Sequence, residues 1–151
     1  MFVTLCLCLC MTALAWAAVS DVLHYRIPDA VHPLIILSFL IMAAAIPLPW
    51  VEIGWRLMMA GVAFTAGLVL FAARAMGGGD VKLLSAILLW FPPAQAPAFL
   101  LLMSLLGGAA ALIVLARART LQIEERRVPY GVAIAGAAAM QLLTPAAAGA
   151  I

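Results

Sequence analysis

The chain of 151 residues has a hydrophobic fraction of 68%, a charged fraction of 9% and a mean hydropathy of +1.24. These values lie far outside the range of soluble domains and indicate an integral membrane protein. At about 20 apolar residues per span, this length holds five or six transmembrane helices and leaves no room for a soluble domain.

The apolar runs are continuous rather than alternating, which favours helices over the strands of a transmembrane barrel. We therefore predict an all-α polytopic membrane protein with about six transmembrane helices, forming a single domain over residues 1–151. The helices are predicted at residues 2–19, 30–46, 55–73, 79–91, 98–116 and 131–150.

The first predicted span ends in MTALAWA, whose small residues are typical of a signal peptidase site, but residues 1–20 contain no Lys or Arg. Because signal peptides begin with a basic region, we expect this span to be retained. Of its three cysteines, Cys6 and Cys10 share a helix face and Cys8 does not. Zinc sites need four ligands, often in C-x-x-C pairs, so we interpret the cysteines as packing residues.

The loop after the first span combines histidines with acidic and basic residues. His24 and His32 flank it, and Asp21, Arg26 and Asp29 lie nearby. The spacing fits no recognised metal site, so we expect no metal and no cofactor. We expect both histidines to be solvated or to contact lipid headgroups, and Asp29 to be able to cap the second helix.

Basic residues indicate the orientation of the chain. Seven of the eight Lys and Arg residues follow the first, third and fifth spans, and Arg56 alone lies on the other side. The positive-inside rule assigns the side with seven to the cytoplasm and places the N-terminus outside. The net charge of +2 thus reflects topology, and no nucleic-acid partner is expected.

The six acidic residues fall into two groups. Glu52 lies in a predicted outside turn, and Glu124 and Glu125 lie beside two arginines in a polar loop, so we expect these three to be solvated. The three aspartates, Asp21, Asp29 and Asp80, all lie on the predicted cytoplasmic side.

Asp80 follows three glycines in MGGGDVK, at the start of the fourth predicted span. From Gly79 to Phe91 this span has a length of about 20 Å, against a hydrocarbon core of about 30 Å. Asp80 is therefore expected at the membrane edge or in a protein cavity, where an ionisable side chain indicates function. Gly77, Gly78 and Gly79 permit backbone angles and close approaches that a Cβ would prevent, although a plain interhelical turn would also explain them.

Asp21 is predicted at the same interface as Asp80. Two carboxyls within hydrogen-bond reach do not both ionise easily, so one keeps a proton while the other activates a water. This is the chemistry of an aspartic protease. Three alternatives stay open: Asp29 in place of Asp21, a small ion- or proton-coupled transporter, and a structural membrane subunit.

Three motifs, in this order, resemble the type IV prepilin peptidase family, whose members are membrane aspartyl proteases with a GxGD motif. They are SDVLHYRIPD, MGGGDVKLLSA and RRVPYGVAIAGAA. The resemblance implies that Asp21 and Asp80 are the two catalytic aspartates. It assigns supporting positions to Arg26, Ile27 and Pro28, to Gly77, Gly78, Gly79 and Lys82, and to Pro129, Tyr130 and Gly131, the last three as a wall of the active-site cavity.

The resemblance also implies a substrate and a location. The substrate is a prepilin with a short basic leader before a hydrophobic helix, cut at the cytoplasmic face of the bacterial inner membrane. Asp29 stands where family members often have Asn. The cytoplasmic domain with paired C-x-x-C ligands is absent from the sequence, so the chain is similar to the short members that serve tight-adherence (Flp-type) pili, and N-methyltransferase activity is not expected.

Overall fold

Six helices make up most of the chain that the structure describes. The computed structural model describes residues 2–46, 48–121 and 128–144. Within them no strand occurs, which confirms the predicted all-α class. The predicted polar loop with Glu124 and Glu125 lies outside this part of the chain. The helices are α1 (Phe2–His24), α2 (Val31–Ala45), α3 (Trp50–Ala72), α4 (Gly78–Leu88), α5 (Ala96–Leu121) and α6 (Tyr130–Leu142).

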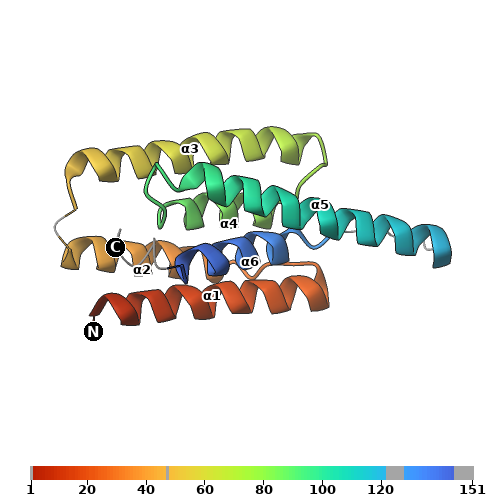
Figure 1. The fold of residues 1–151 in the computed structure, drawn as a ribbon, viewed down its shortest axis with the longest axis horizontal. Helices are drawn as coiled ribbons and strands as arrows, with labels where there is room; N and C mark the ends of the chain where they lie inside the picture. The colour runs from red at the N-terminus through yellow and green to blue at the C-terminus, as the bar shows by residue number, and fades with distance from the viewer. Residues whose placement is uncertain (1, 47, 122–127, 145–151) are drawn as a thin grey trace.

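The helices run along a common long direction, and α5 extends past the others at one end (Figure 1). Among the described residues, three helices are long and apolar enough to cross a membrane: Phe2–His24, Trp50–Ala72 and Ala96–Arg117. The helices α2 and α6 are apolar but shorter. The chain is therefore a multi-pass membrane protein with both long and short helices.

Two helix boundaries differ from the prediction in ways that matter for the site. The first helix continues to His24 instead of ending at residue 19, so Asp21 lies in its last turn rather than after it. The third helix begins at Trp50 instead of residue 55. In both cases the helix continues past the predicted boundary and includes an acidic residue, Asp21 in α1 and Glu52 in α3, because backbone hydrogen bonds do not require apolar side chains.

The short helix α4 is at the centre of the bundle. It packs against α2, α3 and α6, while α1 packs against α2 and α6, and α5 packs mainly against α6. Seven of its eleven residues are buried, from Asp80 to Leu88. A helix that is buried on several sides needs apolar residues on each of those sides. Its buried residues after Asp80 are all apolar: Val81, Leu83, Leu84, Ala86, Ile87 and Leu88. The position of Asp80 therefore depends on how α4 is held.

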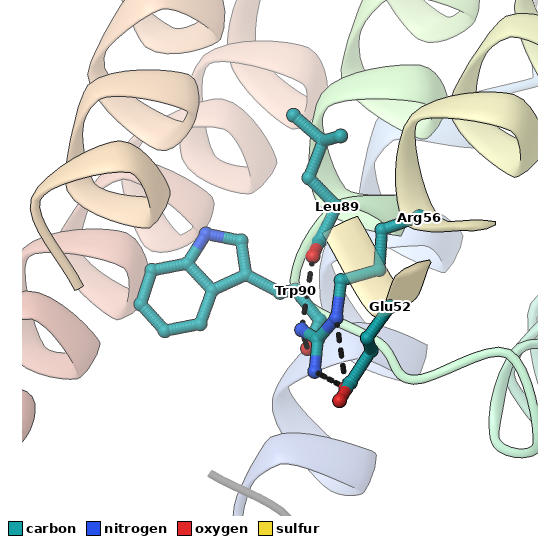
Figure 2. Close-up of polar contacts among 4 residues, drawn as sticks. All are labelled: Glu52, Arg56, Leu89 and Trp90. Atoms are coloured by element: carbon teal, nitrogen blue, oxygen red, sulfur yellow. Dashed lines mark hydrogen bonds and ion pairs between the residues drawn. The ribbon is translucent and has the colours of Figure 1, made fainter. Parts of the chain in front are cut away.

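A buried ion pair holds the end of α4 that is remote from Asp80 (Figure 2). Arg56 of α3 is only 1% exposed, and its Nη1 donates to the carbonyls of Leu89 and Trp90 at 3.2 Å each. Its Nε donates to Glu52 Oε1 at 3.2 Å, and its guanidinium lies 5.8 Å from the centre of the Phe39 ring. The cation thus satisfies carbonyls that follow the last turn of α4.

This arrangement corrects the prediction that Glu52 is solvated in an outside turn. The Glu52 side chain is 30% exposed and is paired with Arg56. Because α3 begins at Trp50, Glu52 and Arg56 lie one turn apart on the same helix face. The carboxylate then compensates a cation that would otherwise be buried alone.

An aromatic contact joins α2 to the same end of α4. The Trp90 Nε1–H donates to the Ile35 carbonyl at 3.2 Å, and the Trp90 ring meets Phe39 edge to face with centroids 6.4 Å apart.

On α1, Cys6 and Cys10 are buried and Cys8 is exposed, which agrees with the interpretation of the cysteines as packing residues.

Candidate active site

Asp21 is buried in the last turn of α1 and faces the start of α6. The Val132 N–H donates to Asp21 Oδ2 at 3.3 Å. A Cβ at Gly131 would lie only 2.8 Å from the same oxygen. Glycine at this position therefore lets the backbone of α6 approach the carboxyl closely enough to hydrogen bond with it.

Asp80 is buried in the first turn of α4. Its Oδ2 accepts a hydrogen bond from the Gly77 N–H at 3.2 Å, and a helix N-terminus favours a carboxylate in this position. The other oxygen, Oδ1, is buried and has no hydrogen-bond partner among the described residues. A buried polar atom of this kind is costly unless a ligand or a proton satisfies it.

The three glycines before Asp80 act through close approach rather than through unusual backbone angles. None of them has a positive φ. Their backbones therefore do not adopt the left-handed conformations that only glycine accepts easily. A Cβ at Gly77 would lie 2.7 Å from Asp80 Oδ2, and one at Gly79 would lie 3.3 Å from the Ile27 side chain. Gly78 faces the Phe71 ring. The glycines thus let α3 and the loop before α2 close around the start of α4.

Asp21 and Asp80 line the same two cavities. The larger has a volume of about 700 Å³ and is also bordered by Tyr25, Arg74 and Tyr130. The smaller has a volume of about 260 Å³ and is bordered by the loop before α2 and the three glycines. Two acids from distant parts of the sequence are thereby brought to one end of the bundle.

Residues in the left-handed region close two helices at the edge of the larger cavity. Tyr25 has a φ of 51° and Arg74 a φ of 58°. The Tyr25 N–H donates to the Asp21 carbonyl at 2.9 Å, and the Ala75 N–H donates to the Leu70 carbonyl at 2.9 Å. These hydrogen bonds are typical of the motifs that end helices, in which the left-handed residue is usually Gly. Larger side chains here border the cavity at some conformational cost.

Ile27 fills the space between the two acidic segments. Besides its contact with Gly79, it approaches α6, where a Cβ at Gly131 would lie 2.9 Å from Ile27 Cδ1. The Ser20 hydroxyl donates to the Arg26 carbonyl at 2.7 Å and holds the loop against α1. The Pro28 carbonyl accepts from the Val31 N–H at 3.1 Å where α2 begins. The loop before α2 therefore lies between the segments that carry Asp21 and Asp80.

Asp29 and Lys82 form an exposed ion pair at the mouth of the smaller cavity, with Nζ and Oδ1 3.1 Å apart. The hydrogen bond and charge of Lys82 lower the pKa of Asp29. The Asp29 side chain is 90% exposed, unlike the two buried aspartates. The prediction that Asp29 caps α2 is wrong, because Ala30 occupies that position without a side-chain hydrogen bond.

His32 belongs to the site, and the prediction that its side chain is solvated is wrong, because it is buried. Its Nε2 lies 3.1 Å from the Gly79 carbonyl oxygen and its Nδ1 lies 3.3 Å from the Asp29 carbonyl oxygen. It therefore links the start of α2 to the glycine segment. Its place one turn after Asp29 was the only signal, and that spacing does not distinguish a buried side chain from an exposed one.

The start of α6 forms one wall of the larger cavity. Pro129 precedes the helix, and Tyr130 borders the cavity. The Tyr130 ring also packs near Gly107 of α5, where a Cβ would lie 3.5 Å from Tyr130 Cδ1. Within the described part of the chain, no group of His, Cys, Asp and Glu side chains is arranged to hold a metal ion.

Comparison with protein families identifies the family of this chain. No curated protein and no solved structure matches the chain significantly. A family model described as the type IV leader peptidase family matches residues 8–112, more than half of the chain. The matched range contains Asp21, Asp80 and the loop and glycine segment between them. The chain therefore belongs to the type IV leader peptidase family.

Proposed function

We propose that this membrane peptidase is an aspartic endopeptidase that cleaves the basic leader from type IV, Flp-like prepilins, with Asp21 and Asp80 acting on a water molecule. The observation that carries the proposal is the pairing of two buried carboxyls on shared cavities, one of them with an oxygen that has no partner among the described residues. Buried ionisable side chains that share a cleft with another ionisable group are candidates for acid–base sites.

In the proposed reaction, one carboxyl is ionised and the other is protonated. The carboxylate takes a proton from water while the water oxygen attacks the scissile carbonyl carbon, and the protonated carboxyl donates a hydrogen bond to the carbonyl oxygen. The tetrahedral intermediate then loses the C–N bond, and the nitrogen receives a proton from a carboxyl. The products are a leader with a free carboxyl group and a pilin with a free amine.

The supporting residues have structural roles in the proposed site. Gly77 and Gly131 allow backbone N–H groups to reach the two carboxyls, and Ile27 sets their spacing. Tyr130 and Arg74 border the cavity that would receive the peptide. Lys82 is paired with Asp29, so we propose that it orients this exposed loop. Among the described residues, Asp80 forms no ion pair.

We further propose that the site opens to the cytoplasm at the inner membrane. The excess of Lys and Arg on this side supports that orientation. The absence of paired C-x-x-C ligands from the sequence supports peptidase activity without N-methylation. The position of both acids at a helix end, rather than near mid-membrane, argues against the transporter alternative.

The test makes the same change, Asp to Asn, at three positions: Asp21→Asn, Asp80→Asn and Asp29→Asn. Each variant is expressed in cells that also express a candidate Flp-type prepilin. The first two are expected to abolish leader removal, by at least about 10³-fold, because an amide neither takes nor supplies the proton. Asp29→Asn is the matched control and should stay within about twofold of wild type, because an exposed ion pair contributes little.

Gel mobility and N-terminal sequencing of the pilin give the result, and immunoblotting checks that each variant accumulates in the membrane. Processing that persists in Asp21→Asn or Asp80→Asn would remove that residue from the proposed pair. An inactive Asp29→Asn variant would make Asp29 the partner of Asp80 instead. If the wild-type chain accumulates and cleaves none of several prepilins, the proposed substrate is wrong.

A further inference from the structure

A groove runs along α3 on the side of the bundle that faces α5. Its volume is about 370 Å³, and its floor is formed by Leu84 and Leu88 of α4. One edge is α3 from Met58 to Leu70, and the other is Leu100 of α5. All of its lining residues are apolar, in contrast to the two cavities that contain the aspartates.

The groove is open because of how the helices pair. The main contacts of α3 are with α4, and those of α5 are with α6. No extensive contact joins α3 to α5 within the described ranges. Close packing of α3 on α4 is made possible by Gly67, where a Cβ would lie 2.6 Å from Val81 Cγ1. The groove floor is therefore fixed relative to Asp80, which precedes Val81.

The groove and the larger cavity are lined by consecutive residues of α3. Leu70 is the last groove residue on α3, and the next residue, Phe71, borders the cavity that contains Asp21 and Asp80. The Phe71 ring lies over Gly78, where a Cβ would be 3.4 Å from Phe71 Cε2. The Phe71 ring thus lies between the last groove residue on α3 and the glycine segment that precedes Asp80.

We propose that this groove holds the apolar helix of the substrate, the segment that follows the cleavage site, and that Phe71 marks the boundary between helix and scissile peptide. The proposal rests on the peptidase function proposed above. From Met58 to Leu70 the groove extends over about 18 Å of helix, which matches three turns of a substrate helix. A lipid chain would fill the apolar part alone, whereas a prepilin uses both the apolar groove and the carboxyl cavity.

Two leucines on α3 provide a matched test. Leu70 borders the groove and Leu68 does not, yet both are 46% exposed on the same helix. In the full chain, Leu70→Trp should lower kcat/KM for an intact prepilin by about tenfold or more, because the indole fills the space for the substrate helix. Leu68→Trp should remain within about twofold, because it changes only the lipid-facing surface. Equal losses in the two variants would overturn the proposal.

A binding measurement separates this proposal from the proposed activity. A photoreactive benzoylphenylalanine at position 70 should crosslink to the hydrophobic segment of the prepilin, and one at position 68 should not. Crosslinking at 70 without any cleavage by the wild-type chain would retain the groove as a helix-binding site and reject the peptidase assignment to this substrate. Two results would reject the groove as the binding site of the substrate helix while retaining the peptidase activity. In the first, the prepilin is cleaved but position 70 crosslinks only to lipid. In the second, the prepilin is cleaved and crosslinks equally to positions 70 and 68.

Discussion

At the scale of single residues, Gly131 lets the backbone of α6 approach the Asp21 carboxyl. A methyl group there would lie 2.8 Å from Asp21 Oδ2 and 2.9 Å from Ile27 Cδ1. Both atoms are at the ends of side chains that can move. We therefore expect Gly131→Ala to displace the carboxyl rather than to unfold the chain, and to lower prepilin cleavage by about 10²-fold, since small misplacements of a reacting group have effects of this size.

Gly136→Ala is the matched control for that prediction. It lies on the same helix, but its Cβ would meet only Leu106 Cδ1 at an ordinary distance of 3.7 Å. Its activity should equal that of wild type. Cleavage assays on purified variants, with membrane accumulation measured in parallel, make the comparison. If Gly131→Ala is as active as Gly136→Ala, the close approach of α6 does not position Asp21.

At the scale of elements, α4 is held at both ends by groups from other helices. Its first turn meets Ile27 and His32 through Gly79, and the carbonyls after its last turn accept from Arg56. We expect Arg56→Met to lower the free energy of unfolding by about 3–5 kcal/mol, because Glu52 and the two carbonyls then lose a buried cation. Thermal unfolding in detergent measures the change.

The double variant Glu52→Gln with Arg56→Met should be less destabilised than Arg56→Met alone, since it leaves no unpaired carboxylate beside the apolar side chain. The difference between the two variants reports the coupling between Glu52 and Arg56. Equal stability of the single and double variants would show that Glu52 does not compensate the buried Arg56 charge.

At the scale of the whole molecule, the proposed orientation can be tested at the two ends of the bundle. Asp29 lies near the carboxyl pair with a side chain that is 90% exposed, and Trp50 lies at the start of α3 with 86% exposure. In a chain whose three cysteines are replaced by alanine, Asp29→Cys should react with a membrane-impermeant maleimide only after the inner membrane is permeabilised. Trp50→Cys should react without that step, because the positive-inside rule places it outside. The opposite pattern would move the proposed cleavage to the outer face.

Local physical rules determined the class of this protein from its sequence alone. A hydrocarbon core admits only helices and closed barrels, so the composition and the continuous apolar runs were enough to predict an all-α membrane protein. The same reasoning singled out Asp80, because an acid at the start of a short span is costly. The motifs around Asp21 and Asp80 were sufficient to indicate the family before any contact was known.

Only the tertiary structure decided which distant residues meet. It brought Asp21 and Asp80 to the same cavities, buried His32 against the carbonyl of Gly79, and paired Lys82 with Asp29. It also placed Arg56 of a supposed outside turn at the end of α4. None of these contacts follows from hydropathy or helical periodicity, because each depends on the packing of helices whose residues are far apart in the chain.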